Sequence, residues 1–241
     1  IAVRSLISKR KNGEKIYTLG SLIHNSIYND ELATLGVRSV SLEDVEKILL
    51  EEPKINHTFV VRTHGITKEQ NDALLSFKEK YNNFSLVDMT CPSVKKIHRI
   101  AEENTTNETC FLLFCNKDHP EAIGIMSYAN GEKHTISSPE ELLKFDFTKK
   151  TPILCSQTTE NLEVFKKIKK FLKNLCTNAI FFDTICSVTE NRQNEAIELS
   201  SKSDVMIVIG GRDSSNTRKL YEICRKRCSN TQWIESVAEL S

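Results

Sequence analysis

The sequence predicts an α/β protein in which helices cover parallel sheets. Short apolar runs alternate with helix-like segments, and several runs are apolar at nearly every position, as buried parallel strands are. The predicted strands are Lys15–Leu19, Thr58–Val61, Ser85–Val87, Phe111–Phe114, Ile153–Cys155, Ile180–Phe182 and Val205–Ile209. The predicted helices are Lys68–Lys80, Ser93–Glu103, Asn161–Leu175, Glu190–Lys202 and Asn216–Arg227. Such alternation is typical of α/β architecture.

Local signals support two of the helix starts. Thr67 and Gln70 have the spacing of a capping box, in which each side chain bonds the backbone of the other, so they open the helix at Lys68. Pro120 suits the first turn of a further helix, since that position needs no backbone N–H donor. We expect this helix to hold His119 and Glu121 at its mouth.

Two strand ends have the same residue pattern, which indicates an internal repeat. Phe84–Cys91 (FSLVDMTC) and Ile180–Cys186 (IFFDTIC) are each an apolar strand, an Asp, two residues and a Cys, followed by a helix. The two cysteines lie 186 − 91 = 95 residues apart, and one more step back falls just ahead of Ile1. We therefore predict three pseudo-repeated α/β domains, at residues 1–90, 91–185 and 186–241, with a third such cysteine upstream of Ile1.

Composition excludes several classes of protein. The chain has 33 Lys and Arg against 32 Asp and Glu, a net charge of +1 without a basic block, which argues against nucleic acid or an anionic membrane as a partner. The longest apolar run, Cys110–Cys115, is far too short to cross a bilayer. The eight cysteines are not spaced like a secreted disulfide scaffold, and the start does not resemble a signal peptide. We expect a cytoplasmic protein with reduced thiols.

Cys91 and Cys186 follow predicted parallel strands, where α/β folds place functional groups. Metal ligands, nucleophiles and small buried side chains are all consistent with that position. Their separation is unlike a zinc knuckle, and distant thiolates that meet at one point suit a cluster at a domain junction. The other six cysteines lie inside strand or helix runs, so we expect them to be packing residues: Cys110, Cys115, Cys155, Cys176, Cys224 and Cys228.

Three histidines, His24, His64 and His119, follow predicted strands. Strand ends of successive units converge in this architecture, so these imidazoles are expected to bind an anionic ligand and to move protons near neutral pH. The remaining histidines are expected to be ordinary solvated or hydrogen-bonded loop residues: His57, His98 and His134.

A phosphate site is predicted at the start of the last helix. There a buried strand ends in Gly210-Gly211 and is followed by Ser214, Ser215 and Asn216. Backbone N–H groups of a helix start, assisted by such side chains, bind phosphate, whereas the simpler alternative is N-capping alone. Gln157–Thr159 also ends a strand and either faces the same crevice or caps a helix. Thr189 is a candidate cap for the helix after Cys186.

Taken in order, seven short motifs resemble the IspH/LytB family of 4-hydroxy-3-methylbut-2-enyl diphosphate reductases. They are IHN (Ile23–Asn25), THG (Thr63–Gly65), DMTCP (Asp88–Pro92), HPE (His119–Glu121), QTT (Gln157–Thr159), DTICSVTENRQ (Asp183–Gln193) and GGRDSSNT (Gly210–Thr217). Each motif is weak alone, but seven in the family's order across almost the whole chain are highly specific.

The resemblance implies a trefoil of three α/β domains around a [4Fe–4S] cluster held by one cysteine from each domain. Cys91 and Cys186 resemble two of these ligands, and the third is expected upstream of Ile1. The family's C-terminal Thr-Ala-Gly-Ala-Ser segment is also absent, so the resemblance implies a chain truncated at both ends. Electrons would come from a ferredoxin or a flavodoxin.

The resemblance also implies roles in forming isopentenyl and dimethylallyl diphosphates. Glu121 would belong to the proton relay, with Thr158 positioning the substrate hydroxyl and His119 assisting. The diphosphate would be bound by His24, His64, His119, Ser214, Ser215 and Asn216. Two alternatives stay open: a zinc hydrolase built from His119, Glu121 and a cysteine, and a non-catalytic diphosphate-binding fragment that lost its cluster.

Overall fold

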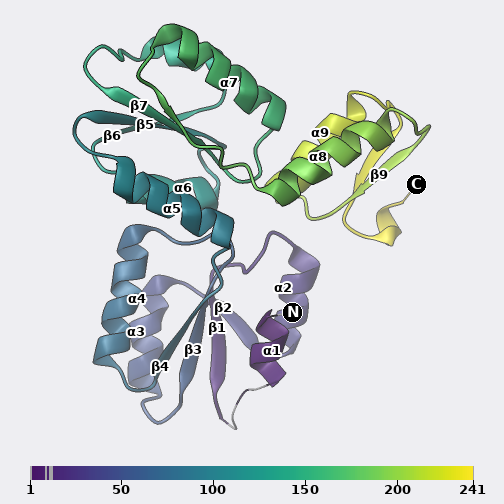
Figure 1. Cartoon of the computed structure of the whole chain (residues 1–241). Helices are drawn as coiled ribbons and strands as arrows, with labels where there is room; N and C mark the ends of the chain where they lie inside the picture. Colours follow the sequence, from purple (N-terminus) through teal and green to yellow (C-terminus); the bar gives the residue numbers. More distant parts are fainter. Residues whose placement is uncertain (1, 9, 11–12, 241) are drawn as a thin grey trace. The chain divides into compact units, whose positions relative to one another are not determined.

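The computed structural model describes residues 2–8, 10 and 13–240, which form two compact units, one ending at Cys91 and one starting at Pro92 (Figure 1). Every strand pairing in the described residues is parallel. The predicted α/β class with parallel sheets is therefore confirmed. The trefoil arrangement and the domain boundary at residue 186 stay predictions.

The first unit is one sheet in the order β2-β1-β3-β4 with helices on both faces. Its strands are β1 Lys15–Leu19, β2 Val37–Val40, β3 His57–Val61 and β4 Phe84–Asp88. Its helices are α1 Ala2–Ser8, α2 Ser26–Thr34, α3 Leu42–Glu51 and α4 Lys68–Lys80. Leu32 of α2 packs with Ile16 and Val60 on one face of the sheet. On the other face α3 and α4 pack against the alternate strand residues, Phe59 among them, because successive strand side chains point to opposite faces.

The second unit contains a four-stranded sheet in the order β6-β5-β7-β8 and a two-stranded sheet, β10-β9. The strands are β5 Thr109–Phe114, β6 Glu132–Ile136, β7 Thr151–Ser156, β8 Ile180–Phe181, β9 Met206–Ile209 and β10 Thr231–Ile234. The α-helices are α5 Pro92–Asn104, α6 Pro120–Tyr128, α7 Leu162–Leu175, α8 Ser187–Ser200 and α9 Ser215–Arg225, with short 3₁₀ turns at Pro139–Lys144 and Val237–Glu239. Helices α5 and α6 cover one face of the larger sheet and α7 covers the other (Figure 1).

The two four-stranded sheets share one topology, which agrees with the predicted repeat. In each sheet, the second strand along the chain pairs with one side of the first strand, and the third and fourth strands lie on the other side. The offset of 95 recurs between the starts of β2 and β6 (Val37 and Glu132) and of α5 and α8 (Pro92 and Ser187). Cys91 and Cys186 each follow the fourth strand of their sheet, so the repeated D-x-x-C motif marks equivalent places.

Three strands were not predicted, and they share a physical cause. Strands β2 (VRSV), β6 (EKHTI) and β10 (TQWI) lie at sheet edges and mix polar with apolar residues, because an edge strand is only partly buried. Helices α1, α2 and α3 in the first unit were likewise not predicted.

Within the described residues, no helix is both long and apolar enough to span a membrane.

Two sequence-based placements were wrong. Helix α8 begins at Ser187 rather than Glu190, with Cys186 as its N-cap residue, so Thr189 is a buried residue of the first turn and not the cap. His57 and His134 lie in strands β3 and β6 rather than in loops, while His98 lies in α5, within the predicted helix Ser93–Glu103. Of the two alternatives for Gln157–Thr159, the structure removes the cap of α7, because the N-cap of that helix is Asn161.

The capping box at Thr67 gives a test of the first unit. The Thr67 side chain accepts from the backbone of Gln70, and the Gln70 side chain accepts from the backbone of Thr67. Thr67→Ala should cost about 1 kcal/mol of helix stability. Hydrogen exchange of the α4 amides should then accelerate about fivefold, whereas the exposed Ser76→Ala in the same helix should change it little. Equal rates in both variants would contradict the assignment.

Candidate active site

Both four-stranded sheets have a topological switch point, where chain connections leave neighbouring strands in opposite directions and open a crevice at the carboxyl ends. In the first unit this point lies between β1 and β3. His24 follows β1 and His64 follows β3, and their ring centroids lie 4.2 Å apart. The expectation that histidines from separate strand ends come together is confirmed for this pair.

The turn that carries His64 is held by several backbone contacts. Gly65 has a φ of 79°, a conformation that favours glycine. Nε of Arg62 donates to the Gly65 carbonyl at 3.1 Å, and the Thr63 hydroxyl donates to the Leu22 carbonyl at 3.2 Å. The first bond closes the loop after β3, and the second connects that loop to the loop after β1, next to the two histidines.

Arg62 is a residue to which the sequence analysis assigned no role. Its guanidinium is partly buried, which lowers its pKa from the ordinary arginine value. It also lines a pocket of about 440 Å³ whose other walls come from the ends of β1 and β2 and from α3 and α4. Only the three-dimensional structure places this cation beside Gly20, which follows the neighbouring strand β1.

His119 follows β5 at the switch point of the second unit's larger sheet. It is the N-cap residue of α6, with Pro120 at the first helical position as predicted. Its Nδ1 accepts from the backbone N–H of Glu121 at 3.1 Å. An Nδ1 that accepts leaves the proton of the neutral ring on Nε2, so that atom is the donor His119 can offer to an anion.

Glu121 is a buried carboxyl with a strongly perturbed pKa. Its side chain is 2% exposed. One carboxylate oxygen accepts from the Thr158 backbone N–H at 2.7 Å and the other from the Thr158 hydroxyl at 2.9 Å. Burial raises the pKa of Glu121 to about 7, while the two Thr158 donors oppose that rise and the charge of Glu160 adds to it. Glu121 can therefore accept and release a proton at neutral pH.

Cys91 and Cys186 occupy matching settings in the two units. The backbone N–H of Cys91 donates to the Thr63 carbonyl at 2.9 Å, and that of Cys186 donates to the Thr158 carbonyl at 3.0 Å. Thr63 and Thr158 are themselves 95 residues apart. Both cysteines are partly exposed free thiols at the start of a helix.

Five of the other six cysteines are buried, as predicted for packing residues: Cys110, Cys115, Cys155, Cys224 and Cys228. Burial raises the thiol pKa of Cys155 to about 12 and raises that of Cys115 still further. The Cys115 and Cys155 thiols therefore stay neutral. Cys176 differs from the prediction in being only partly buried, and its Sγ contacts the Leu172 carbonyl at 3.5 Å.

The start of α9 is capped by Ser214 and still offers hydrogen-bond donors. Ser214 is the N-cap, and its Oγ accepts from the Thr217 backbone N–H at 3.3 Å and the Thr217 hydroxyl at 3.0 Å. Neither bond uses the hydroxyl proton of Ser214. Oδ1 of Asn216 is buried and finds no hydrogen-bond partner in the part of the chain that the structure describes. Ser215 and Asn216 lie in the first turn, where backbone N–H groups have no helical partner.

Buried polar groups support the loop that carries Thr158. Glu160, 2% exposed, pairs with Nζ of Lys219 from α9 at 3.1 Å. Gln193 of α8 accepts from the Leu162 backbone at 3.1 Å and donates to the Glu160 carbonyl at 2.9 Å. The sequence analysis quoted Gln193 in a motif without locating these contacts, since its partners are over thirty residues away.

Repeated parallel sheets with a buried carboxyl of raised pKa and accessible thiols at their strand ends are an arrangement typical of an α/β enzyme. A family model described as LytB protein matches residues 1–241. The chain belongs to the LytB family, and the predicted resemblance is confirmed.

Curated relatives from three bacteria carry the name 4-hydroxy-3-methylbut-2-enyl diphosphate reductase. The chain is 37% identical to the Caldanaerobacter subterraneus protein and 38% identical to the Campylobacter hominis protein, over 98% and 99% of its length and 77% and 82% of theirs. It is 37% identical to the Clostridium acetobutylicum protein over 98% of its length, but spans only 35% of that relative. These relatives are oxidoreductases.

Two solved structures share the fold. The E-1-hydroxy-2-methyl-but-2-enyl-4-diphosphate reductase from Plasmodium falciparum matches with a TM-score of 0.84 at 26% identity, over 99% of this chain and 72% of that one. A structure of (E)-4-hydroxy-3-methyl-but-2-enyl diphosphate reductase, described as the terminal enzyme of the non-mevalonate pathway, matches with a TM-score of 0.65 at 31% identity, over 100% and 82%.

The pKa of Glu121 predicts a pH dependence of stability. Since the folded-state pKa is raised from 4.5 to about 7, this group's stabilisation is complete below pH 4.5 and is lost as pH rises through 7. Glu121→Gln removes the titration, so the stability of the variant relative to the natural chain should rise by about 3 kcal/mol between pH 4.5 and pH 8. Urea unfolding across this range checks it, and parallel pH curves would contradict the raised pKa.

Proposed function

We propose that the chain forms the site of a reductase that removes the hydroxyl of 4-hydroxy-3-methylbut-2-enyl diphosphate and yields isopentenyl and dimethylallyl diphosphates. The observation that supports this most is the buried Glu121–Thr158 pair, a carboxyl with a pKa of about 7 bonded to a threonine hydroxyl. Membership of the LytB family provides the substrate class, because the matching relatives carry that name.

Cys91 and Cys186 fit a role as ligands of a [4Fe–4S] cluster. They are free, accessible and placed at equivalent helix starts, unlike the five buried thiols. When bound, such a cluster supplies electrons and a Lewis-acidic iron for the substrate hydroxyl. The backbone bonds to Thr63 and Thr158 hold the two cysteine backbones in place.

Thr158 and Glu121 act on the departing hydroxyl. The Thr158 hydroxyl donates to Glu121 and can accept from the substrate hydroxyl, so it orients that group toward the proton carrier. The C–O bond breaks, the hydroxyl takes one proton and leaves as water, and two electrons with a second proton complete the product. Glu121 supplies a proton to this sequence, and Nε2 of His119 donates a hydrogen bond.

The diphosphate needs several donors because an anion removed from water must be compensated. We assign this role to His24, His64, His119, Ser214, Ser215 and Asn216. Within their own units, the His24–His64 contact and the donors at the α9 start support the assignment.

The electron donor in this proposal is a ferredoxin or a flavodoxin, and the compartment is the cytoplasm. All eight cysteines, each within the described residues, are free thiols, which suits a reducing environment. A zinc hydrolase at His119 and Glu121 is less well supported, since Glu121 is 2% exposed and both its oxygens are turned to Thr158.

Replacement of either ligand should reduce cluster content. In the full-length protein purified without oxygen, Cys91→Ser or Cys186→Ser should lose most of the iron and sulfide and the brown absorbance. Cys176→Ser, a partly buried thiol elsewhere, should keep them. Unchanged iron in the two variants would remove these cysteines from the ligand set, while a colourless parent protein would contradict the cluster itself.

Replacement of the proton carrier should separate binding from turnover. Glu121→Gln should lower kcat by about 10²- to 10⁴-fold with little change in iron content or diphosphate affinity, because Gln keeps the shape but has no acidic proton. Glu163→Gln, an exposed residue of α7, serves as control. Full turnover in Glu121→Gln would exclude Glu121 from the relay.

A further inference from the structure

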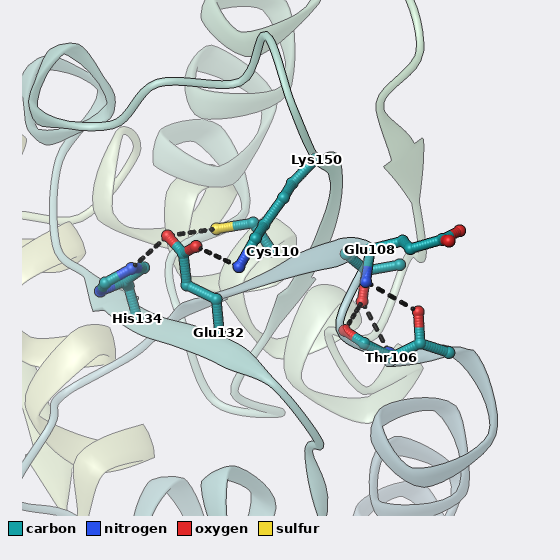
Figure 2. Close-up of polar contacts among 7 residues, drawn as sticks. Thr106, Glu108, Cys110, Glu132, His134 and Lys150 are labelled. Atoms are coloured by element: carbon teal, nitrogen blue, oxygen red, sulfur yellow. Dashed lines mark hydrogen bonds and ion pairs between the residues drawn. The ribbon is translucent and has the colours of Figure 1, made fainter.

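A second group of metal-ligating side chains lies at the opposite edge of the larger sheet from His119. Cys110 is the second residue of β5, and Glu132 and His134 belong to β6 (Figure 2). Cys110 and Glu132 lie at the amino ends of these parallel strands and His134 lies at the centre of β6, whereas the candidate active site follows the carboxyl ends. The reductase proposal uses none of them.

The strand register places the three side chains on one face. Cys110 pairs with Glu132 and Leu112 pairs with His134 across β5 and β6. Glu132 and His134 are two residues apart and therefore point to the same side, and paired residues of neighbouring strands share a face. Cys110 belongs to the core cluster under α7 on this side of the sheet. The backbone, rather than long flexible side chains, brings the group together.

Their ligand atoms are spaced nearly as a tetrahedral metal requires. Oε1 of Glu132 lies 2.9 Å from Nε2 of His134 and 3.6 Å from Sγ of Cys110. All three ligand atoms lie within 4.8 Å of one another. Zinc bond lengths of about 2.0–2.3 Å imply edges of about 3.3–3.6 Å between ligand atoms at tetrahedral angles. Small side-chain movements would bring the group to those edges.

Neighbouring residues orient the group without occupying Oε1. Nζ of Lys150 binds the other carboxylate oxygen, Oε2 of Glu132, at 2.8 Å (Figure 2). The ring of Phe145 packs on His134 with centroids 4.4 Å apart. Hydrogen bonds to a ligating carboxylate and restraint of a ligating imidazole are the usual outer-shell support of metal sites.

The group is open on one side. Cys110 is 2% exposed, but the side chains of His134 and Glu132 are 36% and 37% exposed. A metal ion can thus enter from solvent and keep a water ligand, while the sulfur remains protected below it. In the absence of a metal the same atoms form a hydrogen-bonded set, in which Cys110 donates to Glu132.

We propose that Cys110, Glu132 and His134 form a Zn²⁺ site with water as the fourth ligand. Thiolate, imidazole and carboxylate are the donor types that zinc takes. Binding forms one Zn–S, one Zn–N and one Zn–O bond to protein and releases the thiol proton of Cys110 to water. Because β6 is an edge strand held by β5 alone, the ion ties this edge to the sheet.

Zinc titration tests the site. The natural chain should bind one more zinc per chain than Cys110→Ser or His134→Gln, with X-ray absorption showing one sulfur lost in Cys110→Ser. Cys176→Ser should match the natural chain. Zinc taken up at Cys91 and Cys186 is common to all four proteins and cancels in the difference, so this result is independent of the proposed reductase. Equal zinc uptake by the natural chain and Cys110→Ser would overturn the proposal.

Hydrogen exchange provides a readout that does not depend on how the Cys110 variant folds. At a free zinc concentration 100 times the dissociation constant, exchange of the β6 amides that requires opening of the site should slow about 100-fold. His134→Gln changes a partly exposed side chain and should remove this effect while leaving exchange in β1 and β3 as it was. Slowing of the same size in His134→Gln would also contradict the site.

Discussion

The candidate site depends on one residue, Thr158, whose backbone and side chain bind two functional groups at once. Its N–H and hydroxyl hold the two oxygens of Glu121, and its carbonyl accepts the backbone N–H of Cys186. Thr158 lies two residues after the end of β7, so the sheet sets the positions of Glu121 on α6 and of the cysteine before α8. Any movement of that strand end would disturb both groups together.

The repeat explains why this arrangement exists twice in part, although the buried carboxyl occurs in one unit. Thr63 holds Cys91 as Thr158 holds Cys186, at the same offset of 95 residues. The position equivalent to Glu121 is Ser26, however, and the first unit offers a histidine pair in place of a buried carboxyl. A shared backbone therefore carries different side chains, and the buried carboxyl whose pKa is raised to about 7 belongs to the second unit.

The larger sheet of the second unit has two chemically distinct edges. At its carboxyl edge, His119 and Glu121 are ordered by bonds to backbone and to Thr158. At its amino edge, Cys110 faces Glu132 across neighbouring strands. Parallel strands align all carboxyl ends on one side and all amino ends on the other, so one small sheet can hold a reaction site and a separate ion site without interference.

Much of the fold, and the strand-end positions of the candidate site residues, could be predicted from sequence because they depend on local patterns. Strand β1, helix α4 with its capping box, and the two D-x-x-C strand ends all follow from residues close in the chain. Edge strands such as β6 were missed because partial burial leaves no continuous apolar run. The seven motifs, read together, identified the family that the comparisons then showed.

The amino-acid order alone determined the α/β class, the 95-residue repeat and the choice of Cys91 and Cys186 among eight cysteines. Only tertiary structure decided that both oxygens of Glu121 bond Thr158, 37 residues away, and that Cys110 meets Glu132 and His134. The reason is physical: burial, proton affinity and ligand spacing arise from atoms that the chain brings together over long separations, and local patterns carry no record of those partners.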